Sequence, residues 1–266
     1  MGMLLSQMFF PLIMFITGCF CLSRAQDCGG SNVQNTVIVD QQPGKEQNNN
    51  QWFKIHINPG IYWETITIPI SSPCIILEGS GSNATTIISS QRETTSDWGS
   101  TFSSFATNVI VSDITFKNSY NLEGGSDDIE QALSAAFYGD KSAIFNSSFM
   151  SYQDTLFAAK GRHYFKDMLC YIQGDVDFIF GSGQSYFENC MINATQKDSE
   201  PSGFVTAQRR ENDSDTSDSA QRRERVSWMK KKNLNNSEVN EYSLSSFINK
   251  NGWLTNILYI LVNFLL

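Results

Sequence analysis

NSSFMSYQDTLFAAKGRHYFKDMLCYIQGDVDFIFG, residues 146–181, is the stretch from which the fold can be predicted, because its landmarks recur at a nearly constant interval. Asn146, Asp167 and Asn189 follow one another at intervals of about 21 or 22 residues, which is within the range of known structural repeats. A short apolar run follows each of them closely. A repeat of about 20 to 25 residues, built from short strands without helical periodicity, is typical of a solenoid in which each repeat forms one coil.

The two aspartates of this stretch are expected to be close neighbours. Asp154 and Asp177 are about 23 residues apart, and in a parallel β-solenoid residues one coil apart stack at the strand spacing of about 4.8 Å. Two carboxylates at that range cannot both ionise freely, so the pKa of one of them should rise. Such a pair can supply one carboxylate nucleophile and one general acid/base.

Two glutamines belong to the same pattern. Gln131 precedes Asp154 by the same interval that separates Asp154 from Asp177, and Gln153 immediately precedes Asp154. The spacing predicts that Gln131, Asp154 and Asp177 stack on three successive coils. A side-chain amide near a carboxylate nucleophile can donate hydrogen bonds to a developing oxyanion. An isolated glutamine is more often an ordinary surface residue, and only the regular spacing favours the functional interpretation.

Other polar residues allow narrower expectations. Asp177 lies in the apolar run VDFIF, where burying an aspartate is costly unless it is paired or functional. Asp175, two residues earlier, is expected on the same side of that strand. His56 and His163 have no partner motif for acid/base chemistry, and His163, which precedes an aromatic pair, is expected to be structural. No Gly-x-Ser-x-Gly motif occurs, so a serine hydrolase is not predicted.

Several of these motifs together resemble plant pectin methylesterases. SYQDTLF and GDVDFIFG are similar to the two aspartate signatures of that family, and YGDKSAIFNSSF and GFVTAQRR also match it, in the same order. The resemblance covers about residues 35–217 and is to the type without an N-terminal inhibitor domain. It implies an all-β chain folded as a right-handed parallel β-helix, a single-stranded solenoid like that of pectin lyases, here incomplete at the C-terminal end.

The resemblance also implies a role for each candidate residue. Asp177 would be the nucleophile, and Asp154 the acid that protonates methanol and then the base that activates water. Gln131 and Gln153 would hold the oxyanion, and Gln131 and Thr101 would contact the substrate, although Thr101 could equally cap a turn. The position of Asp175 is usually uncharged in the family. An extra carboxylate there would raise the pKa of the pair further.

The implied reaction is hydrolysis of the methyl esters of pectin, a methyl-esterified homogalacturonan, to pectate and methanol. The resemblance implies no metal and no organic cofactor. It implies pectin and a proteinaceous pectinesterase inhibitor as partners and a monomeric state. The formal charge of −8 argues against nucleic acid as a partner, because phosphate binding needs a basic surface.

The beginning of the chain predicts export to the cell wall. Residues 8–22 are an apolar run followed by Ser23-Arg24-Ala25, so residues 1–25 are expected to be a signal peptide. A membrane anchor is the alternative, but the run is shorter than the roughly 20 residues that a span needs. Sequons at Asn83, Asn146, Asn193, Asn212 and Asn235 fit a glycoprotein of the secretory route.

Four cysteines lie after the expected signal peptide: Cys28, Cys74, Cys170 and Cys190. No C-x-x-C spacing occurs, so a zinc site is not predicted. Cys170 and Cys190 lie one coil apart and could pair in an oxidising compartment, or could remain buried free thiols. The sequence leaves both alternatives open.

The part of the chain after residue 217 does not follow the pattern. Residues 26–217 are expected to form the β-helix, whereas residues 218–266 have no coil period and lack the Leu-Gly-Arg-Pro/Ala-Trp motif of the family, whose arginine pairs with the nucleophile. This tail is expected to be disordered or a gene-model artefact and to pack poorly. A lipid-anchor signal is an alternative for its apolar end.

Three functional hypotheses follow. The first is an active pectin methylesterase of the carboxylic ester hydrolase class. The second is a catalytically impaired pectin-binding or structural wall protein of the same family, because the arginine/tryptophan motif is missing. The third is a polysaccharide lyase or a polygalacturonase, which share the solenoid, but the aspartate, histidine and basic-residue groupings or calcium sites of those enzymes are not found in the sequence.

Overall fold

The computed structural model describes residues 28, 33–39, 51–92, 99–123, 129–167, 169–195, 205–208, 240 and 243–264. The expected signal peptide, residues 1–25, lies outside the described residues, as do residues 209–239.

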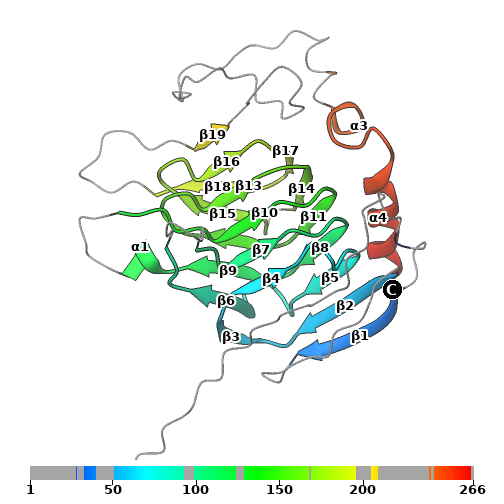
Figure 1. Cartoon of the computed structure of the whole chain (residues 1–266), viewed down its shortest axis with the longest axis horizontal. Coiled ribbons are helices and arrows are strands. Elements are labelled where there is room, and N and C mark those ends of the chain that lie inside the picture. The colour runs from blue at the N-terminus through cyan, green and yellow to red at the C-terminus, as the bar shows by residue number, and fades with distance from the viewer. Residues whose placement is uncertain are drawn as a thin grey trace, which may run out of the picture.

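The strands of the described chain form three parallel sheets, called A, B and C (Figure 1). Sheet A contains β1 (Val33–Val39), β2 (Trp52–Ile57), β5 (Ile75–Glu78), β8 (Val109–Ser112), β11 (Ser142–Phe145), β14 (Arg162–Lys166) and β17 (Gln184–Glu188). Sheet B contains β3 (Gly60–Trp63), β6 (Thr85–Ser89), β9 (Thr115–Asn118), β12 (Ser148–Met150), β15 (Tyr171–Gly174) and β18 (Met191–Ala194). Sheet C contains β4 (Ile66–Ile68), β7 (Phe102–Ser104), β10 (Ala135–Phe137), β13 (Leu156–Ala158), β16 (Ile179–Gly181) and β19 (Thr206–Gln208).

The chain passes through sheets A, B and C once per coil, from β2–β3–β4 to β17–β18–β19, and forms a right-handed parallel β-helix. The predicted fold is therefore confirmed. In sheet A, Phe53 pairs with Ile75, and His163 with Ser185, so these coils have a length within the predicted range of about 20 to 25 residues. Two coils are considerably longer, because Ile75 pairs with Val109 and Val109 with Ser142. The added residues precede β7 and β10, and the short helix α1 (Tyr120–Glu123) lies in the segment before β10.

The landmarks that recur in the sequence mark one corner of the β-helix. Asn146, Asp167 and Asn189 each follow the last residue of a sheet A strand, and all three have positive φ, as Asp113 has after β8. Two of these turns bond to the next coil: the amide of Asn146 donates to the carbonyl of Lys166 at 3.2 Å, and that of Asp167 to the carbonyl of Glu188 at 3.1 Å. Asn and Asp tolerate this left-handed conformation better than other non-glycine residues do. The period therefore reflects a backbone requirement at the turn from sheet A to sheet B.

The interior of the β-helix is filled by side chains that stack from coil to coil. Phe137 packs against Phe102, Phe149 and Phe165 with ring centroids 5.5, 6.2 and 5.9 Å apart, and Phe165 stacks on Phe187 at 4.7 Å. Aromatic pairs at these separations add to the stabilisation that comes from burying their area. The stacked core fixes the register of each coil and thereby the position of the corner residues.

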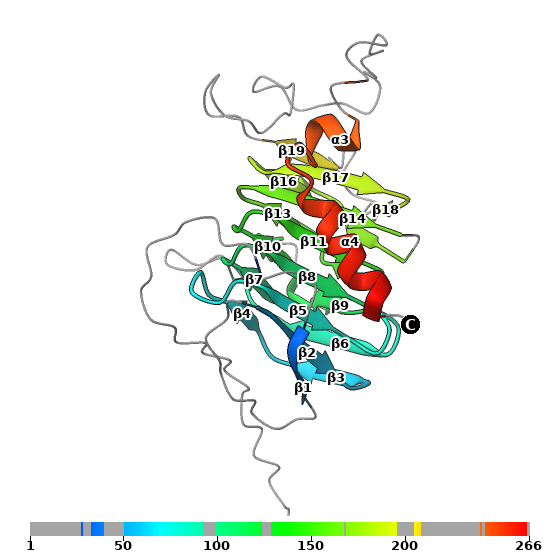
Figure 2. The ribbon, with the colours of Figure 1, turned by 90° about the vertical axis from the view of Figure 1, so that its right-hand side faces the viewer.

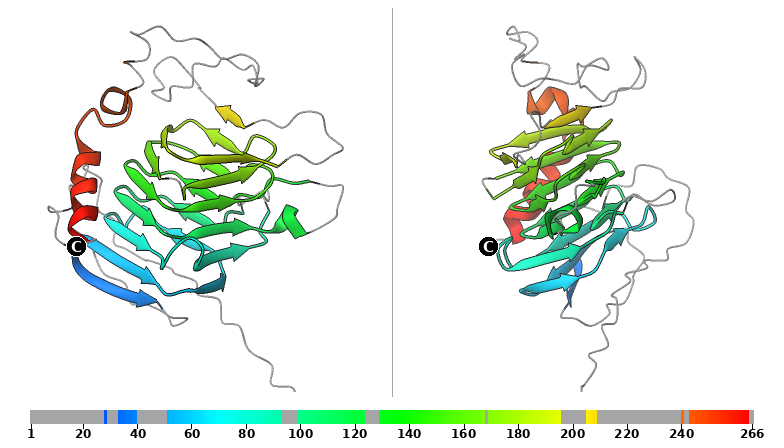
Figure 3. Two further views of the ribbon diagram at one scale, coloured as in Figure 1. Left: turned by 180° about the vertical axis from the view of Figure 1, so that it is seen from behind. Right: turned by 90° about the vertical axis from the view of Figure 1, so that its left-hand side faces the viewer.

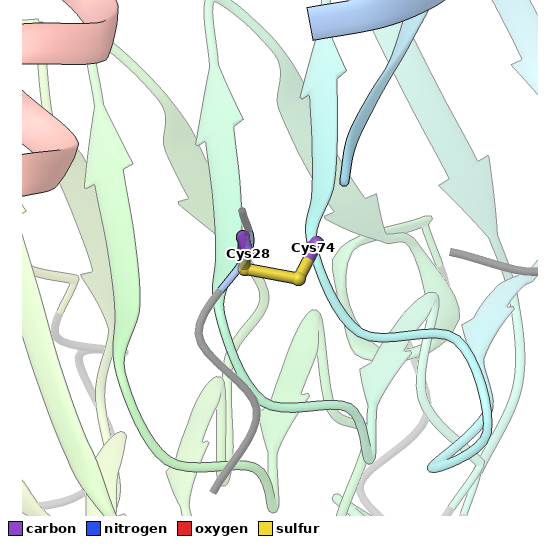
Figure 4. The surroundings of a disulfide bond; sticks show 2 residues. All are labelled: Cys28 and Cys74. Carbon is purple, nitrogen blue, oxygen red and sulfur yellow. A yellow bond between two sulfur atoms is a disulfide. The ribbon is translucent and has the colours of Figure 1, made fainter. Parts of the chain in front are cut away.

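The cysteines take two different states. Cys28 forms a disulfide with Cys74, and this bond ties a residue that precedes the first strand to the start of β5 (Figure 4). Cys170 and Cys190 are free thiols on adjacent coils, and the amide of Met191 donates to the carbonyl of Cys170 at 2.8 Å. Contact with the Cys190 thiol, together with burial, raises the pKa of Cys170. Of the two alternatives, the structure has the free pair.

The end of the chain covers the outer face of sheet A, which the sequence did not predict. Helices α3 (Leu244–Phe247) and α4 (Trp253–Phe264) lie along this face (Figures 2 and 3), and Ile248, Trp253, Leu254 and Ile257 are buried against it. The expectation of poor packing is wrong for residues 248–257, because the apolar side chains of this segment are buried against sheet A. No helix in the described part of the chain is long and apolar enough to span a membrane.

Trp253 is the main contact of α4 with the β-helix. Its ring is buried, its indole N–H donates to the carbonyl of Ile248 at 2.7 Å, and the Arg162 guanidinium lies 5.8 Å from its centroid. We expect Trp253→Ala to lower the free energy of unfolding by about 3 to 5 kcal/mol in urea denaturation, as for other buried aromatic truncations. Asn256→Ala, on the exposed side of α4, should leave it almost unchanged. Equal stabilities of the two variants would show that α4 does not support the fold.

His163 is a buried structural residue, as expected. Its Nε2 lies 3.2 Å from the carbonyl of Gly139, and its ring packs 5.6 Å from that of Phe137. Burial lowers the pKa of His163 to about 4 from its ordinary 6.5, against the opposing effects of the Gly139 carbonyl and Asp140. The imidazole is therefore neutral in the folded chain at neutral pH.

This depressed pKa predicts a specific loss of stability in acid. Between about pH 6.5 and pH 4 the unfolded chain binds a proton at this histidine and the folded chain does not, so the free energy of unfolding falls as the pH falls. From pH 7 to pH 4.5 the loss should be about 2 to 3 kcal/mol. Urea denaturation of His163→Gln, whose amide can still donate toward Gly139, should show a shallower pH dependence by that amount. An identical dependence in both chains would contradict this.

Candidate active site

Asp154 and Asp177 lie at a second corner of the β-helix, where the chain turns from sheet B to sheet C. This corner, called corner BC, consists of residues 151–155 between β12 and β13 and residues 175–178 between β15 and β16. The amide of Asp154 donates to the carbonyl of Val176 at 3.1 Å, and that of Leu156 to Phe178 at 2.9 Å. In a parallel ladder this pattern sets Asp154 level with Asp177 on the next coil. The predicted stacking of the two aspartates is thus confirmed for the backbone.

Both aspartates hold an uncommon backbone conformation. The φ angle is 61° at Asp154 and 48° at Asp177, in the left-handed region. Non-glycine residues in this region are a small minority, and they persist where the surrounding structure imposes the conformation. Here the ladder bonds on both sides of the turn impose it. Two consecutive coils therefore present an aspartate from the same unusual turn.

The two carboxyl groups differ in their exposure to solvent. Asp154 is only 4% exposed, whereas Asp177 is half-buried, with the buried ring of Phe178 next to it in the chain. Burial disfavours the charged form of a carboxyl group. The two carboxyl groups therefore lie in unlike environments, although one oxygen of Asp177, Oδ1, is itself buried.

The two glutamines are placed differently from the prediction. Gln153 pairs with Val176 in a parallel bridge, one residue before the aspartates. The amide of Ala132 donates to the carbonyl of Gln153 at 3.3 Å, which sets Ala132 level with Asp154 and Gln131 level with Gln153. The prediction that Gln131 stacks on Asp154 is therefore wrong by one residue. Gln131 and Gln153, both half-buried, are level with each other on neighbouring coils, and Gln153 comes one residue before Asp154.

The structure does not place Thr101 at the site. Its side chain is fully buried, and its hydroxyl lies 2.8 Å from the Ser89 hydroxyl and donates to the carbonyl of Lys117 at 3.1 Å. A hydroxyl held in this way has no surface to offer a substrate. The expected substrate contact is therefore wrong for this residue, and the alternative of a local structural role describes it better.

A row of aromatic rings beside corner BC was missed from the sequence. Phe157 and Phe180 each follow an aspartate by three residues, pair across β13 and β16, and stack with centroids 4.5 Å apart. Tyr138 meets Phe157 edge-on at 5.6 Å, and Phe105, which is 40% exposed, stacks on Tyr138 at 4.4 Å. The identical spacing after both aspartates was the available signal. These four residues, called the aromatic row, lie in or just after the strands of sheet C, in the segments that follow the corner of the carboxyl pair.

Asp175 does not share a face with Asp177, although strand alternation predicted it. Asp175 is 3% exposed, and its carboxylate accepts a hydrogen bond from the hydroxyl of buried Tyr152 at 2.5 Å. The positive φ of Asp177 marks a turn at this point, so the alternation of a regular strand does not apply. The additional carboxylate is therefore directed at Tyr152.

A second polar cluster lies near the start of the β-helix and brings together residues that the sequence separates. His56 Nδ1 is 2.8 Å from Glu78 Oε2, and His56 Nε2 is 3.2 Å from the Ser80 hydroxyl. This order resembles a nucleophile triad. The backbone amides of Gly79, Ser80 and Gly81, however, donate to Ser112, Thr85 and Asp113, so they are not available to stabilise an oxyanion. The expectation that His56 has no acid/base partner is therefore wrong. The cluster nevertheless lacks the oxyanion-binding amides of a hydrolase site.

Metal ligation is not suggested by the described residues. Within the described ranges, no three His, Cys, Asp or Glu side chains gather closely enough to hold a metal ion. The chemistry available at corner BC is that of two carboxyl groups, two side-chain amides and an aromatic surface.

Comparison with known sequences adds independent information. The family described as Pectinesterase matches residues 25–219. The protein named probable pectinesterase 29 of Arabidopsis thaliana is 38% identical over 213 residues, which cover 73% of this chain and 63% of that protein. Pectinesterase QRT1 of the same plant is 33% identical over 211 residues, which cover 71% of this chain and 53% of that protein. The chain thus spans between about half and two thirds of the length of these relatives.

Solved structures give the same result. The pectin methylesterase from carrot is 30% identical, with a TM-score of 0.57 over 62% of this chain and 51% of that one. A pectin methylesterase in complex with a hexasaccharide is 28% identical, with a TM-score of 0.53 over 59% of this chain and 52% of that one. Both neighbours are named pectin methylesterases.

Proposed function

This chain belongs to the pectinesterase family, and on that premise we propose that it hydrolyses the methyl esters of pectin to pectate and methanol. The observation that carries the proposal is the register of corner BC. It sets the half-buried Asp177 level with the buried Asp154 on the neighbouring coil, next to Gln153 and beside the aromatic row. Two carboxyl groups in unlike environments can divide nucleophile and acid roles between them.

In the first half of the proposed reaction, an oxygen of the Asp177 carboxylate attacks the ester carbonyl carbon. The carbonyl oxygen becomes an oxyanion, to which the side-chain amides of Gln131 and Gln153 donate hydrogen bonds. The bond between the carbonyl carbon and the methoxy oxygen then breaks, and Asp154 gives its proton to the departing methoxide. Methanol leaves, and the substrate acyl group remains on Asp177 as a mixed anhydride.

In the second half, Asp154 is ionised and acts as the base. It takes a proton from a water molecule while the water oxygen attacks the substrate acyl carbon. The anhydride bond breaks, Asp177 recovers its carboxylate, and the new carboxyl group of the polymer ionises in solvent. Asp154 ends the cycle protonated, as it began, so no further reactant is needed.

The aromatic row is proposed to bind the pectin chain. Extended ligands bind in sites lined mainly by apolar and aromatic side chains with few polar groups to fix orientation. Phe157 and Phe180 lie three residues after the two aspartates and offer such a surface next to them. A pectin methylesterase among the solved neighbours is described in complex with a hexasaccharide, which supports an oligosaccharide as ligand here.

We also propose that the protein acts outside the cell, in the wall. The Cys28–Cys74 disulfide supports this, because disulfides form and persist in oxidising compartments. The proteinaceous inhibitor as a partner and the monomeric state stay predictions that come from the resemblance alone.

The proposed function is tested by measuring methanol released from highly methylated pectin by the purified chain. Release that scales with the amount of enzyme, together with new carboxylate in equal amount, is the expected result. De-esterified polygalacturonate is the control and should yield neither. Release of unsaturated or reducing ends without methanol would instead indicate a lyase or a polygalacturonase.

The oxyanion role of Gln153 makes a separate prediction. Gln153→Ala should lower kcat by about 100- to 1,000-fold, as for loss of one oxyanion donor, and should leave KM almost unchanged because the oxyanion exists only in the transition state. Asn256→Ala, which removes an exposed side-chain amide on α4 at sheet A, is the control and should behave as the native chain. A rise in KM with unchanged kcat for Gln153→Ala would assign it to substrate binding instead.

A further inference from the structure

The hydrogen bond between Tyr152 and Asp175 joins the two turns that carry the proposed catalytic groups. Tyr152 is 4% exposed, and its hydroxyl donates to Asp175 Oδ2 at 2.5 Å. Tyr152 precedes Asp154 by two residues, and Asp175 precedes Asp177 by two. The bond therefore spans the same pair of coils as the carboxyl pair, two residues before it along both turns.

The backbone of the same two residues adds further bonds. The carbonyl of Tyr152 accepts from the amide of Asp175 at 2.7 Å and from that of Val176 at 3.4 Å. Tyr152 thus bonds the start of the Asp177 turn, on the next coil, through both its backbone carbonyl and its side-chain hydroxyl. Beyond it, Asp154 and Asp177 both have the left-handed conformation, which persists only where neighbouring contacts impose it.

Burying the carboxyl group of Asp175 costs free energy, which suggests that the position of its turn matters. Burying a charge is unfavourable unless it is hydrogen-bonded or paired, and among the ion pairs of the described residues none involves Asp175. A charge-assisted hydrogen bond is shorter and more directional than a neutral one. The arrangement therefore gives a rigid link where an apolar pair would give only contact.

We propose that Tyr152 and Asp175 form a positioning pair, which holds the turn of Asp177 against the turn of Gln153 and Asp154 at the spacing the reaction needs. The inference rests on the proposed function. Neither residue touches the substrate, and both act through the aspartates that follow them. A displacement of about 1 Å at reacting groups can cost about 100-fold in rate, so a link of this kind has a measurable effect on turnover.

Four variants test the proposal by methanol release. Tyr152→Phe and Asp175→Ala should each lower kcat about 30- to 100-fold with KM within about 2-fold, because the polymer surface is untouched. Asp175→Asn keeps an oxygen that can accept from Tyr152 and should stay within a few-fold of the native kcat. The double variant Tyr152→Phe/Asp175→Ala should be no worse than the poorer single variant, because both remove the same link.

The chain supplies a matched control for Tyr152→Phe. The hydroxyl of Tyr164 donates to Glu188 at 2.8 Å on sheet A, away from corner BC. Tyr164→Phe removes a hydrogen bond of the same chemistry and should leave kcat at the native value. Thermal midpoints measured for every variant keep the assays well below unfolding. A kcat of Tyr152→Phe equal to that of Tyr164→Phe, or an Asp175→Asn as slow as Asp175→Ala, would overturn the positioning role.

Hydrogen exchange separates failure of this inference from failure of the proposed function. If the native chain released no methanol, the proposed function would fall, and the positioning pair would be judged by exchange of the Asp154 amide, which donates to Val176. That amide should exchange at least about 10-fold faster in Tyr152→Phe and Asp175→Ala than in Asp175→Asn or Tyr164→Phe, while amides of sheet A are unchanged. Equal exchange in all four variants would overturn the inference whether or not the chain is active.

Discussion

Asp177→Asn should reduce methanol release from methylated pectin by about 10,000-fold or more, because loss of a covalent nucleophile removes most of the rate acceleration in other hydrolases. Asparagine has nearly the shape of aspartate but cannot attack the ester carbonyl. It also tolerates the left-handed backbone found at Asp177, so the turn should remain intact. The measurement is the initial rate of methanol release at saturating substrate, with the thermal midpoint recorded for both chains.

The control for this variant is Asp167→Asn, which makes the same change at a left-handed turn residue between sheets A and B and should retain most of the activity. If Asp177→Asn kept more than about a hundredth of the native rate while remaining folded, Asp177 would not be the nucleophile. The proposed division of roles between the two aspartates would then have to be abandoned.

Asp154→Asn should lower kcat by about 100- to 10,000-fold, the usual range for loss of a general acid/base. The reason is that methoxide is a poor leaving group unless it is protonated, and that the acyl group on Asp177 needs an activated water. An ester whose alcohol is more acidic, such as a trifluoroethyl ester of the same polymer, needs no protonation to leave. For that ester, Asp154→Asn should release one equivalent of alcohol rapidly and then turn over slowly.

The two esters are compared in native and Asp154→Asn chains by rapid mixing. A burst with the activated ester, and none with the methyl ester, supports Asp154 as both acid and base. An equal loss in the first turnover for both esters would contradict the acid role, and it would point instead to a structural effect of the substitution at this buried position.

The fold could be predicted because the residues that suit its turns recur in the sequence at the length of one coil. Asn146, Asp167 and Asn189 recur because each of them holds the left-handed conformation at a turn from sheet A to sheet B. The stacking of Asp154 on Asp177 follows from the same regularity. The two longer coils, which begin at β5 and β8, interrupt it, and no repeat could be counted there from the sequence.

The position of Gln131 shows where counting residues fails. The amides of Ser134 and Ala135 both donate to the carbonyl of Thr155, so one extra residue is accommodated just before β10. The offset between these coils is 22 residues at Ala132 and 21 at Ala135, which pairs with Leu156, whereas Asp154 and Asp177 are 23 residues apart. Coil lengths that differ by one residue in this way leave no mark in the sequence.

Other parts of the site depend on contacts between distant segments. The hydroxyl of Tyr152 reaches Asp175 on the next coil, and Phe105 stacks on Tyr138 across one of the two longer coils. Helix α4 lies outside the solenoid period altogether, and only its amphipathic pattern could have suggested that it covers a sheet. Its partner face, on sheet A, is recognisable only once the coils are stacked.

The most direct test of the account is to look for the bond between Asp177 and the substrate. The native chain would be mixed with a methylated oligogalacturonide, quenched within milliseconds into hydroxylamine, digested and examined by mass spectrometry. A mixed anhydride on Asp177 predicts hydroxamate on the Asp177 peptide or on the sugar acid, formed in step with methanol and absent in Asp177→Asn. Methanol released at the full rate with no hydroxamate on either partner would contradict the account, because water would then attack the ester directly.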